Sequence, residues 1–127
     1  MSIVFKQKQG GNTSSEENIF LKRIILSSLI PFIFISVLWL IKIFESLTGI
    51  DFSSFGIKPL LAGGLPGILT APFIHEDFRH LFNNSLPLLF LSTMLFYFYP
   101  DVVFRIIFYT WIITGTFVWL AGRTGVH

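Results

Sequence analysis

Three long stretches of the sequence contain no charged residue, and they constrain the fold more than any other feature. They cover residues 24–41, 81–99 and 106–122, and contain 18, 19 and 17 residues. A helix rises about 1.5 Å per residue, so each stretch approaches the ~30 Å thickness of the bilayer's hydrocarbon core. Only 13% of all residues are charged, against about 25% in a soluble domain. The sequence therefore predicts an all-α polytopic membrane protein with three transmembrane helices.

The charge and cysteine content exclude several functions. The formal net charge is only +2 and no basic stripe with interleaved aromatic residues is present, so nucleic acid is not an expected partner. The chain has no cysteine, which excludes disulfides, thiolate catalysis and cysteine metal sites within it. We expect the lipid bilayer as a partner, and neither a cofactor nor a metal.

The boundaries of the predicted elements follow from the charged residues that flank the apolar stretches. We expect a flexible cytoplasmic tail over residues 1–18 and a membrane domain over 19–127, with helices at about 22–44, 76–99 and 102–122. The first stretch exceeds the ~7–15 residues of a signal peptide and no small-residue cleavage site follows it, so we expect a retained span. Lysine and arginine residues are more frequent before this span than in the turn between the second and third spans, which favours a cytoplasmic N-terminus.

Residues 45–74 form an unusual connection between the first two spans. The segment has five glycines and three prolines, which interrupt regular helices, but it is also rich in leucine, isoleucine and phenylalanine. A connection of thirty residues is long enough to suggest a function. We predict a structured loop embedded in the membrane interface, whose backbone bonds within the loop or to neighbouring protein.

A cluster of polar residues marks the start of the second span. After Pro72, we expect Glu76 and Asp77 in the first helical turn, where the helix dipole favours negative charge, and His75 at or near the cap. His80 and Asn84 are four residues apart and therefore lie on one helix face. Both carry N–H donors, and two convergent donors in a low-dielectric pocket can stabilise an oxyanion. The alternative is structural: the same two side chains could hydrogen-bond to the long loop and fix its fold.

The remaining polar residues of this cluster have simpler interpretations. Arg79, together with Glu76 and Asp77, is typical of a solvated helix end, and Asn83 faces another direction than Asn84.

A haem or metal site is a further possibility. His75 and His80 are about 140° apart if both are helical, which argues against two ligands to one ion, although the objection weakens if His75 precedes the helix.

The pattern His75-x-x-x-x-His80-x-x-x-Asn84, at the start of an apolar helix after a Gly/Pro-rich apolar loop, resembles the second core helix of the rhomboid family of intramembrane serine proteases. The surrounding sequence GILTAPFIHEDFRHLFNNSLPLLFLSTMLFYFY is similar to bacterial members in particular. The segment WLAGRTGVH at the end of the chain resembles the sequence that precedes the family's nucleophile loop. The resemblance covers residues 58–127 and implies the first half of a six-helix core.

This resemblance implies a role for each matching residue. His80 and Asn84 match the side chains that form the oxyanion hole together with a backbone N–H, and His75 matches a structural position near the site. The implied substrates are transmembrane segments of membrane proteins, cleaved near the outer face. The implied location is the bacterial inner (plasma) membrane.

The resemblance also implies that the catalytic pair lies outside this chain. The family's nucleophilic serine, in Gly-x-Ser-Gly, and its histidine base are expected beyond His127, which itself matches neither. Ser53, Ser54, Ser85 and Ser92 have no evident base, which a nucleophile requires. We therefore expect the 127-residue chain to be inactive alone and to fold poorly by itself. The alternative within the same superfamily is a non-catalytic pseudoprotease that binds membrane-protein clients.

Overall fold

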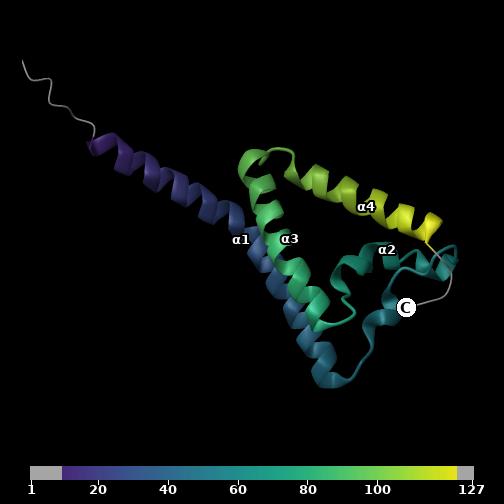
Figure 1. Cartoon of the computed structure of the whole chain (residues 1–127). Coiled ribbons are helices and arrows are strands. Elements are labelled where there is room, and N and C mark those ends of the chain that lie inside the picture. The colour runs from purple at the N-terminus through teal and green to yellow at the C-terminus, as the bar shows by residue number, and fades with distance from the viewer. Residues whose placement is uncertain (1–9, 123–127) are drawn as a thin grey trace, which may run out of the picture.

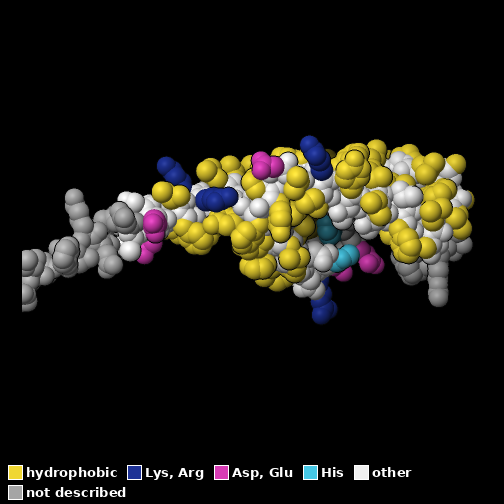
Figure 2. All heavy atoms as spheres, turned by 90° about the horizontal axis from the view of Figure 1, so that it is seen from above, with side chains coloured by type: hydrophobic (Ala, Val, Ile, Leu, Met, Phe, Trp, Pro, Cys, Tyr) yellow, Lys and Arg dark blue, Asp and Glu magenta, His cyan; other side chains and the backbone are white. Residues whose placement is uncertain are grey.

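The computed structural model describes residues 10–122, and all regular elements within that range are helical. Three helices are long and apolar enough to cross a membrane. They are α1 (Gly10–Thr48), α3 (Phe78–Phe98) and α4 (Val103–Ala121). Apolar side chains cover most of the visible face of these helices in Figure 2, as lipid contact requires. The prediction of an all-helical chain with three potential membrane spans is confirmed.

Helix α1 is longer than the sequence suggested. The polar segment expected to be a tail over residues 1–18 is helical from Gly10 onward, while residues 1–9 lie outside the described range. The helix also continues through Pro31 and past Lys42 to Thr48. It ends where Gly49 adopts a φ of 69°, a left-handed conformation that glycine tolerates and most residues avoid. Its 39 residues correspond to about 58 Å, so both ends extend beyond the hydrocarbon core.

Helices α1 and α3 pack directly against each other (Figure 1). The side chains of Leu38 and Leu81 are 2% and 1% exposed, and Thr93 of α3 is also buried. Trp39 donates from Nε1 to Ser85 Oγ at 3.1 Å. Near the other end of α3, the guanidinium of Arg23 lies 4.9 Å from the centre of the Tyr97 ring. These contacts form the main helix–helix interface of the described chain.

The connection between α1 and α3 consists of short helical turns. They are η1 (Phe52–Phe55), η2 (Ala62–Gly64), α2 (Gly67–Thr70) and η3 (Ala71–Phe73). In Figure 1 this segment lies between the far end of α4 and the lower part of α1 and α3. We call residues 49–77 the connecting loop. Its turns agree with the prediction of a structured rather than an extended segment.

Helix α4 contacts the rest of the molecule mainly through the connecting loop. It follows α3 after a short turn, where Phe96 and Phe104 meet edge to face at 5.5 Å and Val103 is buried. Farther along, Trp111 Nε1 donates to Ile68 O at 2.8 Å and Trp119 Nε1 donates to Leu61 O at 3.0 Å. The small residue Gly115 of α4 lies against Ile68 of α2.

Candidate functional site at the start of helix α3

Helix α3 begins later than the acidic residues suggested. Asp77 is the N-cap, with extended backbone angles, and its side chain accepts a hydrogen bond from His80 N at 2.6 Å. Such a cap satisfies one of the free N–H groups of the first turn. Glu76 and Asp77 therefore precede the first helical turn instead of lying within it, and His75 lies two residues before the cap.

His80 and Asn84 lie one turn apart on α3, and both are exposed. Within the described chain, neither side chain forms a hydrogen bond, so neither is bonded to the connecting loop. The neighbouring Leu81 and Ser85 face α1, where the Ser85 hydroxyl accepts from Trp39 and donates to Leu81 O at 2.7 Å. Because successive residues are about 100° apart around a helix, His80 and Asn84 point away from that interface. Their N–H donors are free to meet another group.

His75 places its ring beside His80, although it lies outside the helix. The two ring centroids are 5.6 Å apart and the rings meet edge to face at 66°. The His75 side chain is half-buried, and its Nδ1 atom is sealed from solvent without a hydrogen-bond partner in residues 10–122. Burial lowers the pKa of His75, and the nearby His80 and Lys42 lower it further, while the backbone of Phe73 acts in the opposite direction. The neutral imidazole is thus favoured at this position.

Lys42 holds the end of α1 against the segment that carries His75. Its Nζ donates to His75 O and Glu76 O, both at 3.0 Å, and to Glu45 Oε2 at 2.8 Å. The other oxygen of Glu45 accepts from Phe52 N at 3.2 Å. A single ion pair therefore connects α1 to both ends of the connecting loop. In the sequence Lys42 is only the first charge after the uncharged stretch 24–41, and its i,i+3 spacing from Glu45 is the one signal of this ion pair.

The described residues offer neither a serine–histidine pair nor an evident metal site. The Ser85 hydroxyl is engaged by Trp39 and Leu81, and that of Ser54 lies 3.5 Å from Asp51 O. No serine hydroxyl in the range 10–122 bonds to a histidine. Groups of three or more histidine or acidic side chains that could hold a metal ion are also absent from this range. His127 lies outside it.

Comparison with known proteins places the chain beside longer relatives. No family model matches it, and no solved structure does. It is similar to uncharacterized proteins of Mycobacterium bovis and Mycobacterium tuberculosis, with 34% identity over 95 residues that cover 72% of this chain and 38% of each relative. An uncharacterized protein of Mycobacterium leprae is 30% identical over 92 residues, which cover 72% of this chain and 37% of the relative. The chain thus spans well under half the length of the curated relatives it matches.

Proposed function

We propose that this chain is part of a rhomboid-type intramembrane serine endopeptidase that cleaves transmembrane segments of membrane proteins. The proposal rests on the exposure of the His80 and Asn84 side chains and on their free N–H donors. Both are exposed at the loop-side end of an apolar helix, one turn apart, and neither donor is used within residues 10–122. Polar side chains in a membrane-spanning helix are costly to retain and usually serve a function.

The chemistry of the two side chains suits an oxyanion. An imidazole N–H and an amide N–H donate to the negative charge that develops on the carbonyl oxygen during peptide hydrolysis. Such donors stabilise the transition state most strongly when they are fixed in place and when water is largely excluded. The adjacent His75 ring, with the Lys42 bonds to its backbone, supports His80 from the loop side. Those contacts favour a preorganised site.

In this proposal the present chain supplies the oxyanion-binding half of the site. A serine nucleophile and a histidine base belong to sequence beyond His127, so the 127-residue chain alone is inactive. The greater length of the mycobacterial relatives leaves room for such a second half. The protein would need no cofactor, since a serine–histidine pair supplies both the nucleophile and the base.

The decisive experiment uses the complete protein encoded by the reading frame that contains this chain. Purified in detergent, it is expected to cleave a transmembrane substrate peptide and to react with a serine-directed phosphonate. His80→Ala or Asn84→Ala should each reduce kcat by about 10²–10³-fold, with phosphonate-modified protein still detectable. Asn83→Ala is the matched control, because Asn83 is an exposed neighbour on another helix face, and it should retain activity.

Other results would count against the proposal. Equal activity losses in Asn83→Ala and Asn84→Ala would show that the effect does not depend on the helix face. A complete protein that binds transmembrane clients but neither cleaves them nor reacts with the phosphonate would be a pseudoprotease instead.

The proposal includes an orientation in the bacterial inner membrane, with the N-terminus in the cytoplasm. The chain has no cysteine, so single cysteines can be introduced without background labelling. In intact cells, a membrane-impermeant maleimide should label Ser53→Cys in the connecting loop and should fail to label Asp101→Cys in the turn after α3. The reverse pattern would show the opposite orientation.

A further inference from the structure

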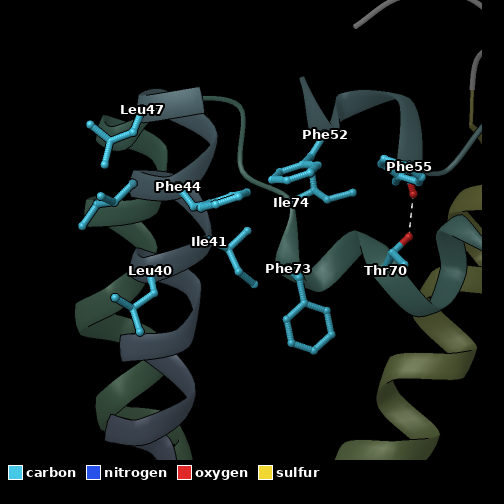
Figure 3. A pocket seen from close by; sticks show the side chains of 10 residues that line it. Leu40, Ile41, Phe44, Leu47, Phe52, Phe55, Thr70, Phe73 and Ile74 are labelled. Carbon is cyan, nitrogen blue, oxygen red and sulfur yellow. Dashed lines mark hydrogen bonds between the residues drawn. The ribbon is translucent and has the colours of Figure 1, made fainter. Parts of the chain in front are cut away.

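An open apolar pocket lies between the last turns of α1 and the connecting loop. Its volume is about 810 Å³, within the ~300–1,000 Å³ typical of small-molecule sites. Figure 3 shows side chains of α1 on one side and of η1, α2 and η3 on the other. The lining residues are Leu40, Ile41, Ile43, Phe44, Leu47, Phe52, Phe55, Thr70, Phe73 and Ile74.

The pocket has no free polar side chain with which to bind a polar ligand. Thr70 is the only polar residue among those that line it. Its hydroxyl donates to Phe55 O at 2.5 Å, across the pocket wall, and is therefore already engaged (Figure 3). The remaining lining side chains are aliphatic or aromatic. An occupant that fits this surface is a hydrocarbon.

The position of the pocket along α1 places it at the edge of the bilayer. The uncharged stretch of the first span ends at Ile41, and the pocket extends from Leu40 to Leu47 on α1. The other face of these turns is polar, because Lys42 and Glu45 line a separate polar cleft with Asp51. The last turns of α1 are thus amphipathic, as expected of a segment at the membrane–water interface.

The pocket also continues the lipid-facing surface of α1. A single stripe of exposed apolar residues runs along the helix at alternating spacings of four and three, and its last three members line the pocket. These residues are Ile33, Val37, Leu40, Phe44 and Leu47. A hydrocarbon chain that lies along this stripe in the bilayer would therefore reach the pocket without crossing a polar barrier.

We propose that this pocket holds one acyl chain of a membrane lipid. Transfer from the bilayer brings no hydrophobic gain, because lipid tails are as apolar as the pocket wall. The gain is van der Waals contact with two facing walls at once, where the exposed surface of a single helix offers only one. The walls are well defined, since the rings of Phe44 and Phe52 stack at 6.4 Å with an angle of 10°, and Phe55 lies 6.2 Å from Phe52. A bound acyl chain joins α1 to the connecting loop.

The test is photocrosslinking of the complete protein that contains this chain, in phosphatidylcholine vesicles in which a small fraction of the lipid carries a diazirine on one acyl chain. After irradiation, adducts are located by mass spectrometry of proteolytic fragments. The expected result is severalfold more adducts per residue on residues 40–47, 52–55 and 70–74 than on residues 32–33, which are exposed on the same helix and report ordinary lipid contact. Equal labelling of both regions would overturn the proposal.

Two variants sharpen the test. Ile43→Trp places a large side chain in the pocket and should abolish the excess of pocket adducts. Ile33→Trp makes the same change on the exposed stripe outside the pocket and should leave the excess intact. An unchanged excess in Ile43→Trp would contradict occupancy of the pocket. Fewer lipid adducts in the pocket than at residues 32–33 would show that protein, such as a second copy of the chain, covers the pocket in place of lipid. The wild-type pattern remains decisive even if Ile43→Trp does not fold.

Discussion

Helices α3 and α4 are both apolar and similar in length, yet they are held in different ways. α3 packs along α1 through a buried seam that includes Leu38, Leu81 and Thr93. α4 has few contacts with α3 beyond their connecting turn. It is joined to the connecting loop by side-chain hydrogen bonds from Trp111 and Trp119 and by a close approach at Gly115.

The difference follows from the kind of segment against which each helix packs. A regular helix satisfies its own backbone, so α1 and α3 need only complementary side-chain packing. The connecting loop has irregular backbone, whose carbonyl groups require partners where water is scarce. The indole N–H groups of Trp111 and Trp119 in α4 donate to two of these carbonyl groups, Ile68 O and Leu61 O. In addition, Trp119 O accepts a hydrogen bond from Leu60 N at 3.1 Å. Leu60 has a positive φ of 60°, which is uncommon for leucine, and this last bond helps to hold it.

The largest effect is expected from a cavity in the α1–α3 seam. Leu81 is 1% exposed, so Leu81→Ala should lower the free energy of unfolding by about 2–5 kcal/mol. The measurement is chemical denaturation in detergent micelles, followed by tryptophan fluorescence. Phe82→Ala is the control, because Phe82 is 58% exposed, and it should cost far less. Similar losses in the two variants would contradict a seam maintained by packing.

A smaller loss of stability is expected from a larger side chain at the contact between α4 and the connecting loop. A Cβ atom at Gly115 would lie 2.5 Å from Ile68 Cγ2, so Gly115→Val should cost about 1–3 kcal/mol through overpacking. Hydrogen exchange measured by mass spectrometry should rise in residues 60–70 and remain unchanged in the α1–α3 seam. Thr114→Val introduces the same side chain at an exposed neighbour. If it accelerates exchange equally, the close contact at Gly115 is not the cause.

The smallest effect should be a dependence of stability on pH, confined to the contacts between α1 and the connecting loop. The pKa of His75 lies below 6.5 in the folded chain, mainly because of burial, with His80 and Lys42 adding to the shift. Well above pH 6.5 His75 is neutral in both the folded and the unfolded state, and its contribution to stability is complete. As the pH falls below 6.5, the unfolded chain binds a proton first, so stability decreases until the folded pKa is passed.

Denaturation midpoints at about pH 7.5 and pH 5.5, on either side of the ordinary histidine pKa, would measure this effect. His75→Gln should remove most of the difference. The α4 side provides the control, because the described contacts of Trp111 and Trp119 with the loop involve no titratable side chain. The hydrogen-exchange protection of residues 60–70, relative to the intrinsic exchange rate at each pH, should therefore change little. A difference that survives in His75→Gln would assign the effect to another group near Lys42, such as Glu45, Glu76, Asp77 or His80.

Much of this arrangement could be predicted from local sequence patterns. The uncharged stretches predicted three potential spans, and the spacing of His80 and Asn84 placed both side chains on one face of α3. The exact start of α3 was harder to predict, because an aspartate such as Asp77 suits both the N-cap and the first helical turn. The start of α1 at Gly10 was not predicted either, because residues 10–18 are polar and have no apolar periodicity.

The three apolar spans and the local geometry of the His80–Asn84 pair follow from the sequence alone, because hydrophobic length and helical period depend only on neighbouring residues. The bond from Lys42 to His75 O and the bonds from the α4 tryptophans to the loop depend instead on the tertiary structure. These contacts join residues 33 to 58 positions apart. They depend on the path of an irregular segment, whose backbone groups bond to whichever donors the fold brings near. The pocket beside α1 depends on the same path, because its two walls face each other only after the connecting loop has turned back toward α1.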